Sequence, residues 1–129
     1  MNGRPIQCSG IKDLSRAMVG ASFPASLTRD SIDIARFADM LVTAQSLRRL
    51  GSAALNLSFV AAGRLDGYWA TSIKPWDIAA GVLLVTEAGG WISDVSRQPL
   101  DLDQPRVLAA ATPELAESIA GVLQVPPTA

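Results

Sequence analysis

The stretch KPWDIAAG, residues 74–81, decides how the surrounding chain folds. Pro75 cannot sit inside a helix, so it ends whatever element precedes it. Asp77 is a preferred helix N-cap, because its side-chain oxygen can accept from an unpaired backbone N–H. No polar side chain occurs from Ile78 to Val85, and a helix that is apolar on all sides is a buried one. We therefore predict a buried helix with a carboxylate at its start. Gly81, which costs such a helix about 1 kcal/mol relative to Ala, predicts close packing against its backbone.

From the residues alone, Asp77 has two interpretations. It can be an ordinary N-cap, or it can be a metal or substrate ligand at the positive end of a helix. The surroundings favour the second interpretation, since DGYW at 66–69 precedes it, TEAGG at 86–90 follows it, and RLGSAAL at 49–55 lies upstream. In this order and spacing, these motifs resemble the C-terminal signature of the inositol monophosphatase family.

The resemblance implies a function and a set of site residues. Members of that family are Mg²⁺-dependent phosphatases that hydrolyse small phosphomonoesters such as inositol monophosphate. The Asp of their Trp-Asp pair is a metal ligand that also contacts the substrate, which implies both roles for Asp77. Their Gly-Ser/Thr-Ala turn contacts the substrate as well, which implies substrate binding by Gly51, Ser52 and Ala53. Mg²⁺ as the cofactor suits a sequence without histidine, because this ion prefers oxygen ligands.

Without the resemblance, the Gly51–Ser52 turn has a simpler interpretation. A glycine turn followed by a serine that caps residues 53–62 is typical of a well-packed strand, turn and helix. The same arrangement offers free N–H groups and a positive dipole end to an anion. Both interpretations stay open at this point.

Composition excludes several classes of protein. The 129 residues carry 11 basic and 12 acidic side chains, so nothing favours nucleic acid or an anionic membrane as a partner. The single cysteine, Cys8, excludes an internal disulfide and makes the cytoplasm the default compartment. The absence of histidine excludes Ser-His-Asp chemistry and zinc sites with histidine ligands.

Hydrophobic periodicity and turn residues predict strands that alternate with helices. This alternation predicts an α/β fold with a mainly parallel sheet, and the resemblance implies a layered α/β sandwich with helices on both faces. In such sheets ligands bind at the carboxyl ends of strands, where Gly51–Ser52 and Asp77 both fall. The expected strands are 15–22, 46–50, 67–71, 91–95 and 106–111, and the expected helices are 28–45, 53–62, 78–88 and 113–124.

Two positions near the motif depart from family patterns. Asp66-Gly67 looks like part of the family signature Asp-Pro-x-Asp-Gly-Thr, but Arg64 stands where its first Asp would be, so we expect Asp66 to hold a turn or a cap. Ala70 stands where many inositol-specific members carry a Glu that binds a substrate hydroxyl. The resemblance therefore implies a phosphomonoesterase without implying specificity for inositol.

The start of the chain resembles the middle of a family member. We expect residues 1–9 to be a remnant strand of an N-terminal half and residues 10–129 to be the C-terminal α/β domain. In the family that other half carries the remaining metal ligands, so Asp77 is the one ligand expected here.

Two functions follow as expectations. The first is part of a Mg²⁺-dependent phosphatase, inactive alone, whose partners are a small phosphomonoester and either a separate N-terminal half or a homodimer partner. The alternative is a non-catalytic remnant or anion-binding module with the family fold.

Overall fold

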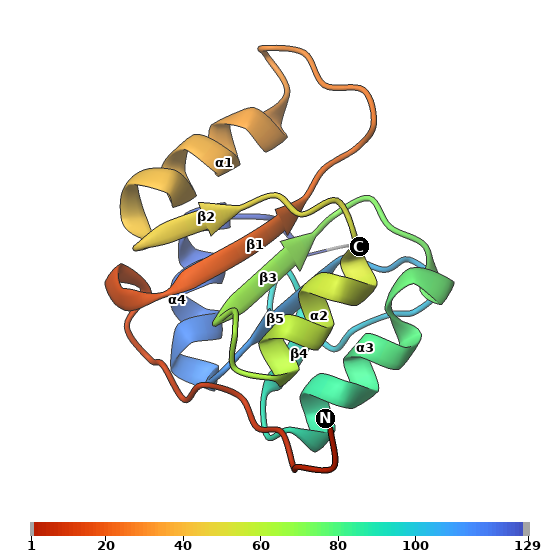
Figure 1. Cartoon of the computed structure of the whole chain (residues 1–129). Helices are drawn as coiled ribbons and strands as arrows, with labels where there is room; N and C mark the ends of the chain where they lie inside the picture. The colour runs from red at the N-terminus through yellow and green to blue at the C-terminus, as the bar shows by residue number, and fades with distance from the viewer. Residues whose placement is uncertain (1, 128–129) are drawn as a thin grey trace.

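One sheet organises residues 2–127, the part of the chain that the computed structural model describes. Its five strands lie in the order β2-β1-β3-β5-β4 (Figure 1). The strands are β1 (Met18–Ser22), β2 (Ser46–Arg48), β3 (Gly67–Ala70), β4 (Trp91–Asp94) and β5 (Val107–Ala110). The helices are α1 (Ile32–Thr43), α2 (Ala53–Ala61), α3 (Pro75–Glu87) and α4 (Pro113–Leu123), with a short 3₁₀ helix, η1, at Leu14–Arg16.

The sheet is mixed. β1 pairs in parallel with β2 and with β3, whereas β5 runs antiparallel to both β3 and β4. Four strands therefore point the same way and β5 opposes them, which refines the expectation of a mainly parallel sheet. The cause is the connection from β4 to β5, which contains no helix among the described residues. A strand that returns without a crossover helix pairs antiparallel with its predecessor.

Helices cover both faces of the sheet. Helices α2 and α3 lie together on one face, and α1 and α4 lie on the other (Figure 1). Two apolar clusters result, one on each face. Every residue of β3 and β5 is buried, as expected for central strands covered on both sides. The predicted layered α/β fold is confirmed.

Helix α3 begins earlier than the sequence predicts. Its N-cap is Lys74 and Pro75 occupies the first helical position, where the missing N–H of proline costs nothing. Asp77 is the third helical residue, and its Oδ2 accepts a hydrogen bond from the Lys74 backbone N–H at 3.0 Å. The prediction that Asp77 is the N-cap is wrong, although its carboxylate still satisfies a donor at the helix start.

The burial predicted for α3 is only half correct. Ile78, Gly81 and Val85 are buried, but Leu83 is 61% exposed and Leu84 is 41% exposed. The close packing predicted at Gly81 is confirmed, because a Cβ there would lie 2.6 Å from atoms of the Leu57 side chain on α2. Helix α3 thus presses one face tightly on α2 and leaves an apolar face open.

The N-terminal segment holds no strand between residues 2 and 9, while Met1 lies outside the described residues. The Cys8 backbone N–H donates to the Ala88 carbonyl at the end of α3, at 3.1 Å. The Ser9 hydroxyl donates to Asp66, whose other carboxylate oxygen accepts from the Met18 N–H at 2.7 Å. The segment is therefore tied to a helix end and a turn instead of a strand edge, and Asp66 has the turn role predicted for it.

Candidate functional site

A cavity of about 420 Å³ opens where β1, α2 and α3 meet. It brings together all four residues predicted to bind substrate, although they come from two helices separated by β3. Its lining residues are Ser22, Phe23, Gly51, Ser52, Ala53, Ala54, Ser72, Ile73, Trp76 and Asp77.

The turn before α2 forms one wall. Gly51 has a φ of +77°, a left-handed conformation that glycine adopts without steric cost. Ser52 is the N-cap as predicted, and its hydroxyl oxygen accepts from the Leu55 N–H at 3.2 Å. Since the first N–H groups of a helix have no partner within it, the start of α2 presents a positive end to the cavity.

Asp77 stands on the facing wall, half-buried at the start of α3. Its Oδ2 is used by the Lys74 backbone, and no donor within residues 2–127 bonds its Oδ1. It is the one carboxylate among the lining residues. One carboxylate oxygen is therefore free to bind a ligand in the cavity.

These residues alone do not fit a magnesium site. Nowhere in the described chain do three or more histidine, cysteine, aspartate or glutamate side chains gather around a point that could hold a metal ion. Glu87, the other carboxylate of α3, lies ten positions further on, about 15 Å along the helix at 1.5 Å per residue. Mg²⁺ takes six oxygen ligands, so with Asp77 as the one carboxylate the other five would have to be waters or substrate oxygens, whereas such sites commonly use one or two carboxylates together with substrate phosphates.

Ser22 is a lining residue that the sequence analysis did not identify. Its Oγ lies 2.6 Å from the hydroxyl oxygen of Tyr68 on the neighbouring strand β3. Burial raises the pKa of Tyr68 to about 12; the hydrogen bond to Ser22 lowers it, and the negative charge of Asp77 adds to the rise. A polar residue that ends a strand, at the edge where ligands bind, was the signal that could have revealed Ser22.

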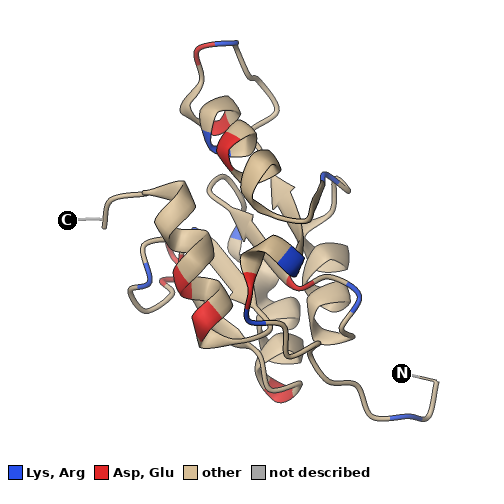
Figure 2. Ribbon diagram, turned by 90° about the vertical axis from the view of Figure 1, so that its left-hand side faces the viewer, with Lys and Arg blue, Asp and Glu red and all other residues tan. Residues whose placement is uncertain are grey.

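Positive charge is also present beside the cavity. The guanidinium carbon of Arg49 lies 5.2 Å from the ring centre of Phe23, a lining residue. In the view of Figure 2, basic and acidic residues are interspersed along the ribbon. Arg49 is therefore a positive charge near the cavity, whereas the charged residue among those that line it is Asp77.

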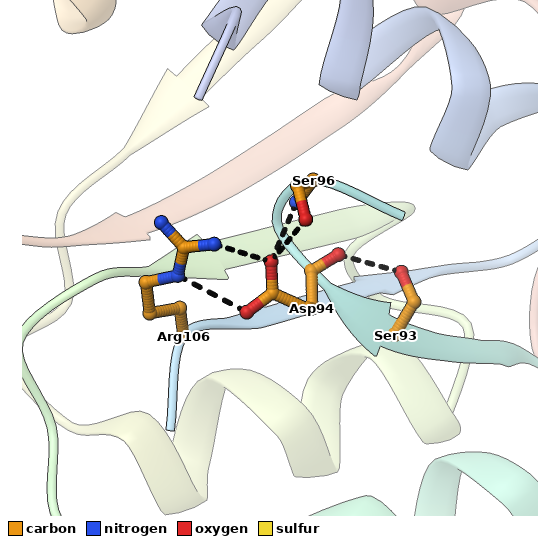
Figure 3. Close-up of polar contacts among 4 residues, drawn as sticks. All are labelled: Ser93, Asp94, Ser96 and Arg106. Atoms are coloured by element: carbon orange, nitrogen blue, oxygen red, sulfur yellow. Dashed lines mark hydrogen bonds and ion pairs between the residues drawn. The ribbon is translucent and has the colours of Figure 1, made fainter. Parts of the chain in front are cut away.

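A second carboxylate, Asp94 at the end of β4, has a different environment (Figure 3). It is 5% exposed and forms a two-bond ion pair with Arg106, at 2.8 and 3.1 Å. The N–H and hydroxyl of Ser96 donate to it as well, at 2.8 and 2.6 Å. Burial raises the pKa of Asp94, but the hydrogen bonds from Arg106 and Ser96 outweigh it and hold the pKa below its ordinary value. Asp94 is a structural group, since the protein itself occupies its oxygens.

The model of the inositol monophosphatase family matches residues 1–125. This chain belongs to that family. The motifs at residues 74–81 and 49–55 are those that resemble the C-terminal signature of the same family.

Relatives and solved structures agree with this assignment. Inositol-1-monophosphatase of Synechocystis is 43% identical over 84% of this chain and 38% of its own length. Nus factor SuhB of Pseudomonas aeruginosa is 38% identical over 87% of this chain and 42% of its own length. The structure of inositol monophosphatase from Anabaena has a TM-score of 0.87 and 40% identity, covering 98% of this chain and 50% of that protein. The chain thus spans half, or less, of the length of these relatives.

Among the described helices of this inositol monophosphatase family member, none has the length and apolar character needed to cross a membrane.

Proposed function

We propose that this chain supplies the substrate-binding side of a Mg²⁺-dependent phosphatase that hydrolyses small phosphomonoesters. The observation that carries the proposal is the cavity that joins the Gly51–Ser52–Ala53 turn to Asp77. The start of α2 offers N–H groups and a dipole to an anionic substrate, and Arg49 adds positive charge nearby. Asp77 offers its free oxygen as a ligand for a metal ion or a substrate hydroxyl.

The proposed magnesium site needs more ligands than this chain provides. Asp77 is the metal ligand assigned here, and we propose that the others come from an N-terminal half, whether it lies on the same polypeptide or on a separate partner chain. The open apolar face of α3, with Leu83 and Leu84, supports such a partner, since exposed apolar patches are typical of association surfaces. We place the assembly in the cytoplasm, which suits a chain whose one cysteine is free.

The proposed substrate class is broader than inositol phosphates. Ala70 is fully buried and pairs with Ser22 in the sheet, and its methyl side chain cannot accept a hydrogen bond from a ring hydroxyl as a Glu there would. We therefore propose small phosphomonoesters in general, with inositol monophosphate as the first to test.

The test is release of phosphate from inositol monophosphate and from other small phosphomonoesters, with Mg²⁺. The purified chain is assayed alone and with the N-terminal half of the Synechocystis inositol-1-monophosphatase, once gel filtration shows that the two associate. We expect no turnover by the chain alone and Mg²⁺-dependent turnover by the complex. Asp77→Asn should reduce the turnover of the complex by at least about 100-fold, because removing a charged group that acts on the transition state costs about 3 kcal/mol or more. Turnover by the chain alone would contradict the proposed sharing of ligands.

One observation favours the alternative, an anion-binding module without catalysis. A single carboxylate lines the cavity in a chain that otherwise keeps the family fold. That function predicts phosphate binding by the chain and no turnover by an associated complex, so the same assay separates the two.

A further inference from the structure

Ser22, Ala70 and Tyr68 lie on one face of the sheet. Ser22 is the last residue of β1 and pairs directly with Ala70 on β3. Tyr68 lies two residues before Ala70, and side chains two apart along a strand point to the same face. This is the face covered by α2 and α3, so the Ser22 hydroxyl stands between a buried phenol and the cavity.

The direction of the hydrogen bond between Ser22 and Tyr68 follows from burial. Tyr68 is fully buried, and within residues 2–127 its hydroxyl bonds only to Ser22 Oγ, at 2.6 Å. If Ser22 donated, the phenolic proton would be left buried without an acceptor, which costs about 1–3 kcal/mol. If Tyr68 donates, the buried phenol is satisfied and the Ser22 proton is free to turn towards the cavity. The ordinary pKa of a tyrosine phenol is 10.0, so Tyr68 is protonated and remains a donor at neutral pH.

We propose that Ser22 is a substrate-binding residue that donates a hydrogen bond to a phosphate oxygen in the cavity, and that Tyr68 is the positioning residue that orients it. The inference rests on the proposed function and adds a named contact to it. The Ser22 hydroxyl would act together with the start of α2, which lines the same cavity through Gly51 and Ser52. A hydroxyl that already accepts from one side has its proton directed to the other, so the ligand contact is set before the ligand arrives.

The test uses the full 129-residue chain and inorganic phosphate as the probe. Binding is followed by backbone amide chemical shifts for the wild type, Ser22→Ala, Tyr68→Phe and the double variant. We expect about 10-fold weaker binding for Ser22→Ala, as for the loss of a hydrogen bond to a charged group. For Tyr68→Phe we expect about 3-fold weaker binding, since the hydroxyl remains but is no longer oriented. The double variant should match Ser22→Ala, because Tyr68 acts only through Ser22.

Two further variants keep the test decisive. Ser22→Thr retains the hydroxyl and should retain most of the phosphate binding even if Ser22→Ala lowers stability. Ser118→Ala is the matched control, because the Ser118 hydroxyl on α4 donates to the Glu114 carbonyl of its own helix, neither residue lines the cavity, and binding should be unchanged. Thermal unfolding by circular dichroism checks that each variant folds.

The outcomes separate this inference from the proposed function. Unchanged phosphate binding in Ser22→Ala would overturn the inference and leave the proposed function standing on Asp77 and the α2 turn. Additive losses in the double variant would overturn the positioning role of Tyr68. A wild-type chain whose cavity amides show no shift with phosphate would overturn the inference together with the anion-binding part of the proposed function.

Discussion

Asp77 and Asp94 are the same chemical group in opposite situations. Asp94 is 5% exposed and accepts four hydrogen bonds, two from Arg106 and two from Ser96. Asp77 is half-buried and accepts one hydrogen bond, from the backbone N–H of Lys74. Asp94 closes a loop after β4, and Asp77 opens onto a cavity.

The difference shows which carboxylate can act on a ligand. A carboxylate whose oxygens are occupied by the protein's own donors stabilises the fold and has nothing left to offer. A carboxylate with one free oxygen beside a cavity is available to a metal ion or a hydroxyl. The comparison predicts that changes near Asp94 affect stability, whereas changes at Asp77 affect binding.

Arg106→Ala should have the largest effect on stability. The Arg106 side chain is 18% exposed and that of Asp94 is 7% exposed, so the variant leaves a buried charge without its partner. We expect the free energy of unfolding to fall by about 3 kcal/mol. Urea denaturation measures it. Glu117→Ala is the control, because it breaks the exposed Arg97–Glu117 pair at 3.5 Å and should cost less than about 0.5 kcal/mol. Equal losses of unfolding free energy in Arg106→Ala and Glu117→Ala would contradict the structural role assigned to Asp94.

Alkaline pH should reveal the buried phenol beside the cavity. The pKa of Tyr68 is raised to about 12, above the ordinary value of 10.0, so the unfolded chain loses its proton first as the pH rises. The stability that this group contributes is complete below pH 10 and is lost between about pH 10 and 12, a loss of about 2–3 kcal/mol. Tyr68 is the only tyrosine, so tyrosinate absorbance reports its titration directly. An absorbance midpoint near pH 10 in the folded protein would contradict this prediction.

Acid pH should act through Asp94. Because its folded pKa is held below the ordinary value, its contribution to stability is present above the unfolded pKa and is lost as the pH falls through the folded pKa. As the pH falls below the ordinary value of 3.8, the free energy of unfolding should therefore fall less steeply in Asp94→Asn than in the wild type. Asp13→Asn is the matched control: hydrogen bonds from Ser15 lower the pKa of Asp13, but it is fully exposed, so the change in slope should be smaller.

Asp77→Asn should have the smallest effect on stability. The Asn side-chain oxygen can still accept from the Lys74 N–H, so we expect a change below about 0.5 kcal/mol. The same variant should abolish any Mg²⁺ binding that calorimetry detects in the wild type. A large loss of stability, or Mg²⁺ binding equal to that of the wild type, would make Asp77 a second structural carboxylate.

Local sequence signals predicted most of the elements. The Gly51–Ser52 turn and the helix after it are as predicted, because a glycine turn and a serine cap act within a few residues. The alternation of strands and helices also predicted the layered fold, and family motifs predicted which residues share the cavity.

The errors came from partners that are distant in the sequence. The outer face of α3 is apolar, and no property of the helix itself says whether another element covers Leu83 and Leu84. Residues 2–9 bond to a helix end instead of forming a strand, while the expected mainly parallel sheet holds, with β5 as its one antiparallel strand. Ser22 gains its importance from Tyr68, 46 positions later, through a contact that strand pairing alone creates.

The contact between Gly81 and Leu57 in the core helps to set the distance between the two walls of the cavity. It holds α2 and α3 at one separation, and the starts of these two helices carry the Gly51–Ser52 turn and Asp77. Gly81 lies about 6 Å along the helix axis from Asp77. A side chain at position 81 would wedge the helices apart and widen the gap between the two ligand contacts. Gly81, which has no side chain, therefore helps to determine how long a ligand can be and still contact both the Gly51–Ser52 turn and Asp77.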